Sequence, residues 1–117
     1  MKKKALIISL SGYELTKNEL RLFKKFTPWG VILFKRNIKN YNQIKKLTSS
    51  LKKITKDKKY PILIDEEGGT VSRLTSIIDN KVFSQRYFGK IYEINKRAGL
   101  KFYKHYINRI NLILKDI

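Results

Sequence analysis

Three short, mostly apolar runs divide the first part of the chain. They lie at Ala5–Leu10, Gly30–Phe34 and Ile62–Ile64, and turn-forming or charged residues follow each of them. Runs of this length and pattern are typical of strands that are covered on both faces in a parallel sheet. We therefore predict three buried strands.

Amphipathic stretches separate these runs. Thr16 and Glu19 form the pattern of a capping box, and Pro28 marks the end of the helix that follows. Asn40 is the predicted cap of a second helix, in which apolar side chains recur every three or four residues from Tyr41 to Ile54. The order β-α-β-α-β implies parallel strands joined by right-handed crossovers, in either a closed barrel or an open doubly wound sheet.

After the acidic loop that follows the third run, the rest of the chain is predicted to be helical from Ser84 on. Ser84–Phe88 has the pattern of a short helical turn closed by Gly89, and apolar residues continue at helical spacing from Ile91 to Ile117. The chain contains no internal repeat or linker. We expect residues 1–117 to form a single, partial domain.

The formal charge of +18 makes nucleic acid the first alternative partner, because basic surfaces attract phosphate backbones. Lysine supplies 21 of the 27 basic residues, while isoleucine (16) and asparagine (8) are also frequent. These three amino acids have AT-rich codons, so biased base composition explains the charge without a binding function. A small basic nucleic-acid-binding module stays the alternative, but the chain has no recognisable nucleic-acid motif and no phosphate-binding loop. We expect no specific nucleic-acid partner.

Composition argues against several other classes. The chain has no cysteine, which excludes a disulfide framework, and its one histidine, His105, has no second metal ligand near it in the sequence. We therefore expect no metal site. The apolar run after Met1–Lys4 is shorter than the roughly seven to fifteen residues of a signal-peptide core, and no run approaches the ~20 residues that cross a bilayer. We predict a cytoplasmic protein without membrane insertion.

The strongest chemical signal follows the third apolar run. Three carboxylates at Asp65–Glu67 precede the pair Gly68–Gly69, and Arg73 follows closely. Arg36–Asn37 comes after the neighbouring strand. Ligands of α/β proteins bind at the carboxyl ends of strands, so these residues are predicted to share a binding rim.

Two of these segments resemble a known family. Residues 30–37 read G-V-I-L-F-K-R-N, and residues 65–74 read D-E-E-G-G-T-V-S-R-L. The amino-terminal part of glycoside hydrolase family 3, in its bacterial β-N-acetylhexosaminidases, has the patterns G-V-I-L-F-x-R-N and D-Q-E-G-G-x-V-x-R-L. The chain is similar to that family over roughly Ala5 to Tyr92. Glu66 stands where glutamine is usual.

The resemblance implies a fold and a sugar-binding role. The fold is the first βαβαβ units and a terminal helix of a TIM-type (β/α)8 barrel, incomplete here because such a barrel needs about 250 residues. The residue matching Asp65 accepts hydrogen bonds from hydroxyls of the terminal sugar, and the one matching Arg73 helps to hold the same ring. We thus predict Asp65 and Arg73 as substrate-binding residues.

Six neighbouring residues are expected to support them. Glu66 and Glu67 can each brace a basic neighbour, and the pair Gly68 and Gly69 permits close backbone approach. The rim is ordered by the remaining two residues, Arg36 and Asn37.

No catalytic residue is assigned in this chain. The family's aspartate nucleophile and histidine acid/base lie in later motifs, and neither Asp79 nor Asp116 has a matching context. Asp65 and Glu67 are neighbours along one strand, whereas glycoside hydrolysis needs groups on both sides of the scissile bond. The resemblance implies that an intact relative would remove terminal β-linked N-acetylglucosamine from cell-wall muropeptides during recycling, without a metal or an organic cofactor. We expect an amino-terminal fragment of such an enzyme, inactive alone, whose unpaired strand edge favours self-association.

Overall fold

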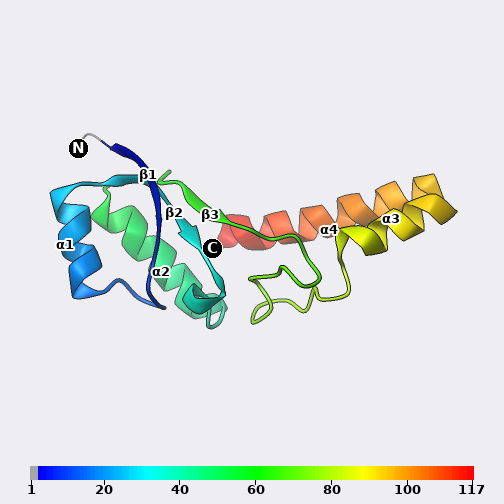
Figure 1. Ribbon diagram of the computed structural model, residues 1–117, viewed down its shortest axis with the longest axis horizontal. Coiled ribbons are helices and arrows are strands. Elements are labelled where there is room, and N and C mark those ends of the chain that lie inside the picture. The colour runs from blue at the N-terminus through cyan, green and yellow to red at the C-terminus, as the bar shows by residue number, and fades with distance from the viewer. Residues whose placement is uncertain (1–2) are drawn as a thin grey trace. The chain divides into compact units, whose positions relative to one another are not determined.

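The computed structural model describes residues 3–117 and contains two compact units. The first unit ends at Asp65 and carries the sheet, and the second is Glu66–Ile117 and carries a loop and two helices (Figure 1).

The first unit is a three-stranded parallel sheet with two crossover helices. In chain order its elements are β1 (Lys4–Ser9), α1 (Lys17–Lys25), β2 (Pro28–Leu33), the 3-10 turn η1 (Lys35–Asn37), α2 (Tyr41–Ile54) and β3 (Ile62–Ile64). The strand order is β1-β2-β3, and both pairings are parallel. Two right-handed crossovers that advance in the same direction place both helices on one face of the sheet. The predicted βαβαβ order and the parallel pairing are confirmed.

Side-chain caps begin both helices of this unit. The Thr16 hydroxyl accepts from the Glu19 amide at 3.2 Å, and the Glu19 carboxylate accepts from the Thr16 amide at 2.7 Å, as predicted. The same carboxylate also accepts from the Ser11 amide at 2.9 Å, which ties the β1–α1 loop to the helix. Burial alone would raise the pKa of Glu19, but the hydrogen bonds from Thr16 and Ser11 outweigh it and lower that pKa. Asn40 caps α2 through the Gln43 amide at 2.9 Å.

The core of the first unit lies on one face of β2. Val31 and Leu33 are 0% and 3% exposed, whereas Ile32, which points to the opposite face, is only partly buried. The prediction of a buried first strand is wrong, because Leu6 and Ile7 are 53% and 50% exposed. β1 is an edge strand, and within residues 3–65 no helix covers the second face of the sheet. Residues 62–64 of β3 are likewise only partly buried.

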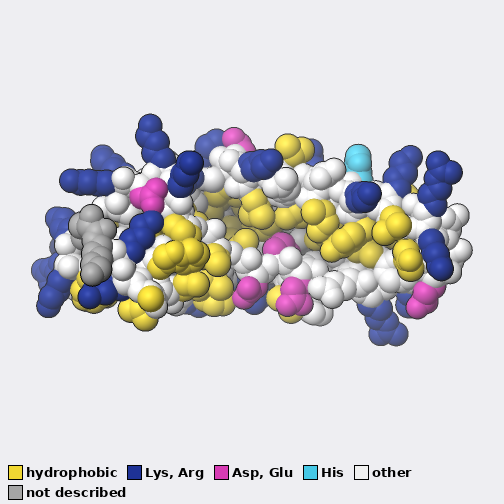
Figure 2. Space-filling view, turned by 90° about the horizontal axis from the view of Figure 1, so that it is seen from above, with side chains coloured by type: hydrophobic (Ala, Val, Ile, Leu, Met, Phe, Trp, Pro, Cys, Tyr) yellow, Lys and Arg dark blue, Asp and Glu magenta, His cyan; other side chains and the backbone are white. Residues whose placement is uncertain are grey.

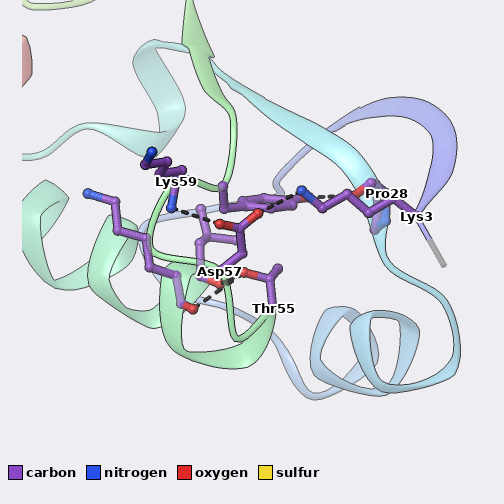
Figure 3. A network of polar contacts seen from close by, with 8 residues as sticks. Lys3, Pro28, Thr55, Asp57 and Lys59 are labelled. Carbon is purple, nitrogen blue, oxygen red and sulfur yellow. Dashed lines mark hydrogen bonds and ion pairs between the residues drawn. The ribbon is translucent and has the colours of Figure 1, made fainter. Parts of the chain in front are cut away.

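A polar network joins the amino ends of the strands to the turn before β3 (Figure 3). The Lys3 Nζ atom lies 2.6 Å from the Asp57 carboxylate, which also accepts from the Lys59 amide at 2.8 Å. The Tyr60 hydroxyl donates to the Pro28 carbonyl at 3.1 Å, and the Lys3 Nζ atom lies over the Tyr60 ring, 5.6 Å from its centre. Burial, and to a lesser degree the Asp57 charge, raises the pKa of Tyr60 to about 12.

The second unit ends in two packed helices, α3 (Gln85–Ile94) and α4 (Lys96–Asp116), which run side by side in opposite directions (Figure 1). The prediction that Gly89 closes a short turn is wrong, since α3 continues past it. The predicted uninterrupted helix from Ile91 is also wrong. Asn95 ends α3 and caps α4 by accepting from the Ala98 amide at 3.0 Å. Asparagine side chains compete with helix amides in this way, and the break lets the chain reverse.

The two helices of this unit approach each other closely at one point. A Cβ atom on Gly99 would lie 2.6 Å from the Cα atom of Tyr92, so only glycine fits there without a shift. Apolar side chains remain open along the pair, among them Phe102 (60% exposed) and Leu112 (62% exposed), and lysines and arginines flank them (Figure 2). Among residues 3–117, the helices are all too short or too polar to cross a bilayer.

Candidate functional site

The carboxyl ends of β2 and β3 lie next to each other in the first unit. Leu33 is paired with Ile64, so Asp65 comes directly after one strand end and η1 comes just after the other. The Asp65 side chain is exposed. This is the edge of a parallel sheet at which ligands of α/β proteins bind.

Arg36 and Asn37 brace this edge through the backbone that follows β1. The Arg36 Nε atom donates to the Leu10 carbonyl at 2.9 Å, and the Asn37 amide donates to the same carbonyl at 3.0 Å and to that of Gly12 at 2.9 Å. Asn37 also accepts from the Phe34 amide at 2.9 Å and is completely buried. Both side chains therefore hold the backbone that follows the carboxyl end of β1.

Glu66 organises the loop that opens the second unit. Its Oε2 atom accepts from the backbone amides of Arg73 at 2.8 Å and Leu74 at 3.0 Å. Its Oε1 atom accepts from the Asn80 side-chain amide at 2.8 Å and from the Gly68 amide at 3.3 Å. The carboxylate therefore holds the backbone amide of Arg73, whereas the sequence predicted that it would brace a basic side chain.

Gly68 and Gly69 let the loop fold tightly beside residues 81–84. Their φ angles are +75° and +62°, a region that other L-residues rarely adopt. A Cβ atom on Gly68 would lie 2.1 Å from the Phe83 carbonyl oxygen, and one on Gly69 would lie 2.8 Å from the Ser84 Cβ atom. Both the conformation and the close approach thus require glycine.

Asn80, like Glu66, makes several of the hydrogen bonds that hold this loop, and the sequence did not predict this role. The side chain is fully buried, accepts from the Ser72 hydroxyl at 2.6 Å and donates to Glu66 and, at 3.4 Å, to the Tyr106 hydroxyl of α4. Burial raises the pKa of Tyr106, the Asn80 hydrogen bond opposes this, and the Glu66 charge adds to the increase. The run Asp79-Asn80-Lys81 reads as an ordinary polar turn, so no local pattern identifies Asn80 as the partner of a carboxylate fourteen residues earlier.

The other predicted residues are distributed over both units. Glu67 is exposed, and its amide donates to the Val71 carbonyl at 3.0 Å within the loop. Arg73 is partly buried in the second unit, whereas Asp65 ends the first. Their joint contact with one sugar stays a prediction. His105 is exposed on α4, and residues 3–117 contain no group of three or more His, Cys, Asp or Glu side chains placed to hold a metal ion.

Curated proteins provide the first comparison. The chain is 34% identical over 96 residues to a β-hexosaminidase of Methylobacillus flagellatus, an alignment that covers 80% of this chain and 26% of the relative. It is 41% identical over 68 residues to a β-hexosaminidase of Glaesserella parasuis, covering 58% of this chain and 20% of the relative. The chain thus spans about a quarter or less of the curated relatives it matches. No family model matches it.

Solved structures agree with the curated relatives. NagZ from Neisseria gonorrhoeae, crystallised with N-trifluoroacetyl-D-glucosamine, superposes with a TM-score of 0.55 at 29% identity, over 66% of this chain and 22% of the other. A glycoside hydrolase family 3 β-N-acetylglucosaminidase from Paenibacillus gives a TM-score of 0.54 at 30% identity, over 60% of this chain and 14% of the other. The resemblance predicted from the sequence is confirmed.

Proposed function

From this resemblance to the bacterial β-N-acetylhexosaminidases of glycoside hydrolase family 3, we propose that the chain supplies part of a pocket for a terminal β-linked N-acetylglucosamine. The observation that carries the proposal is the run Asp65–Leu74, which matches the family pattern and forms a loop held by Glu66. In this proposal both units belong to one incomplete (β/α)8 barrel domain.

Asp65 and Arg73 have complementary roles in the proposed pocket. A carboxylate can accept two hydroxyl protons at once, and hydrogen bonds to a charged acceptor are the stronger kind. A guanidinium donates in a fixed planar fork to ring or hydroxyl oxygens. Glu66, Gly68 and Gly69 keep the backbone before Arg73 in one conformation, which lowers the entropy lost when a sugar binds.

The chemistry itself is assigned elsewhere. Retaining hydrolysis needs a nucleophile and an acid/base about 5 Å apart on either side of the bond, and we place neither in this chain. The chain alone is therefore expected to bind sugar weakly and not to hydrolyse it. Cell-wall muropeptides as the biological substrate and a cytoplasmic location are part of the same proposal.

A chimera tests the pocket. Residues 5–92 would replace the matching segment of Neisseria gonorrhoeae NagZ, and turnover of a chromogenic N-acetylglucosaminide would be measured. Asp65→Ala and Arg73→Ala should each lower kcat/KM by a factor of order 100, since about 3 kcal/mol of charge-assisted bonding to the transition state is lost. Asp79→Asn, at an exposed carboxylate of the same loop, is the matched control and should change kcat/KM less than about twofold.

Two results would contradict the proposal. Unchanged kcat/KM in Asp65→Ala, in a chimera that is otherwise active, would remove Asp65 from the pocket. Turnover at an enzymatic rate by the purified 117-residue chain would show that the catalytic groups lie within it.

A further inference from the structure

A long groove lies along α1 and α2 in the first unit. Its volume is about 1260 Å³, and Leu20, Phe23, Leu47 and Ile54 contribute apolar lining. The apolar surface open to a ligand comes from Leu20, which is 36% exposed, and from Leu15 and Ile54, which are partly buried; Phe23 and Leu47, at 1% and 2% exposed, lie beneath it. A ligand in this groove would therefore bury apolar surface.

Lysines border this apolar lining. Lys24 comes from α1, Lys45, Lys46 and Lys53 come from α2, and Lys56 follows α2. All five are exposed, and Glu14 is the one carboxylate among the residues that line the groove. Base composition accounts for the number of lysines in this chain but not for an apolar groove beneath a group of them. An occupant should be acidic where it meets the lysines and apolar where it meets the apolar lining.

We propose that this groove binds an acidic amphipathic helix of a partner protein. α2 has 14 residues, so at 1.5 Å per residue the groove can follow it for about 20 Å, the length of three to four helical turns. Lys46 and Lys53 are one heptad apart on α2 and lie about 10 Å apart along its axis. Acidic residues one heptad apart on a facing helix can meet both.

The shape of the groove favours a helix over other acidic partners. An amphipathic helix inserts apolar side chains at positions i, i+3 or i+4, and i+7 into an apolar groove, as known helix-in-groove complexes do. A lipid surface is broad, whereas the apolar lining of this groove lies between two helices. A phosphate backbone would meet the lysines but gain nothing from the apolar lining.

Fluorescence anisotropy with the full 117-residue chain tests this proposal. The probe is a labelled peptide of about 18 residues with leucines at helical spacing and glutamates elsewhere, and the reference is a scrambled peptide of the same composition. At roughly 0.15 M salt the amphipathic peptide should bind at least about tenfold more tightly than the scrambled one.

Charge reversal locates the binding surface. The double variant Lys46→Glu/Lys53→Glu should weaken binding of the amphipathic peptide at least about tenfold. The control Lys39→Glu/Lys58→Glu alters the net charge equally at exposed positions outside the groove lining and should change Kd less than about twofold. Leu20→Gln removes apolar contact without changing charge and should weaken binding about fivefold. Circular dichroism of each variant checks that its helix content is unchanged.

Several outcomes would overturn the proposal. Equal affinity for the amphipathic and scrambled peptides would show attraction by charge alone. Equal losses in the groove variant and its control would show that binding is not localised. Vesicles of phosphatidylglycerol that bind more tightly than the peptide, and lose binding only in the groove variant, would assign the surface to a membrane. The proposal would also be wrong if the folded chain did not bind the amphipathic peptide.

Discussion

Each unit contains a carboxylate that accepts hydrogen bonds from nearby N–H groups, but the carboxylate of the first unit lies at the surface and that of the second is enclosed by its loop. Asp57 lies at an exposed turn and pairs with the Lys3 ammonium and the Lys59 amide (Figure 3). Glu66 is partly buried and accepts from four N–H groups of its own loop. The partners of Asp57 can turn to water if the carboxylate is lost, but those of Glu66 are held within the loop.

The difference shows why the number of polar contacts is a poor guide to their importance. A surface ion pair gains little because water screens it and both side chains lose freedom. A carboxylate that satisfies enclosed donors matters more, since its removal leaves those donors without an acceptor. The loop after β3 should therefore depend on few residues, and the turn before β3 should tolerate change.

The largest expected effect is at Gly68. Gly68→Ala should destabilise the loop by about 3 kcal/mol or more, because it combines a positive φ with a Cβ atom 2.1 Å from the Phe83 carbonyl oxygen. Hydrogen exchange of the loop amides would report the loss. Gly89→Ala is the matched control: its Cβ atom meets nothing within 4 Å, and alanine should stabilise α3 by up to about 1 kcal/mol. Equal effects at the two glycines would refute the described loop geometry.

Glu66→Gln is expected to have the next largest effect. The glutamine NH₂ group cannot accept, so two of the four N–H donors lose their acceptor, at a cost of about 2 kcal/mol. Exchange of the Arg73 and Leu74 amides should accelerate about thirtyfold. Glu67→Gln, at the exposed neighbouring carboxylate, should leave both rates nearly unchanged. Unaltered protection in Glu66→Gln would mean that the loop is held by other contacts.

A smaller effect is expected at Glu19 and should depend on pH. Its pKa is lowered in the folded chain from 4.5, so its stabilising effect is complete above that value and is lost as the pH falls through the folded pKa. Protection of the Ser11 and Thr16 amides should decline over this range by a factor corresponding to about 1 kcal/mol. Glu19→Gln should abolish the pH dependence, while Glu14→Gln, at an exposed carboxylate, should preserve it. If hydrogen-exchange protection of these amides in the wild-type chain did not change over this pH range, the assignment would be wrong.

The smallest expected effect is that of Asp57→Asn. The Lys3 side chain, and then the Lys59 amide, lower the pKa of Asp57, but the ion pair lies at the surface, where solvent screens it. The unfolding temperature of the variant should be slightly lower than that of wild type at low salt and equal to it at high salt. A lower unfolding temperature that persists at high salt would show that Asp57, like Glu66, satisfies donors that cannot turn to water.

The sequence was most informative where structure depends on neighbouring residues. The cap at Thr16, the cap at Asn40 and the strand at Ile62–Ile64 each follow from a few adjacent side chains, and all three were predicted. The resemblance of Asp65–Leu74 to a family motif also rests on adjacent residues.

Sequence reasoning failed where distant residues decide the structure. The exposure of Leu6 and Ile7 depends on what covers β1, not on their own apolar character. Gly89 is of the type that often follows a helix end, but α3 continues past it because one glycine inside a helix costs only about 1 kcal/mol, and Asn95 ends the helix instead. Asn80 is joined to Glu66 across fourteen residues, and no periodic pattern records such a pair.

The buried Asn37 side chain also bears on how the first two strands find their alignment. The pairing of β1 with β2 is irregular at its start, where Lys4 to Ile7 on one strand lies opposite Pro28 to Gly30 on the other. Past the other end, the Asn37 amide donates to the carbonyls of Leu10 and Gly12. A slip of one residue would offer these donors the wrong carbonyls and would turn each β1 side chain to the opposite face. Asn37 thus favours one register of β1 against β2 at this end. The other end can then accommodate the extra residue of the irregular pairing without shifting the rest of the strand.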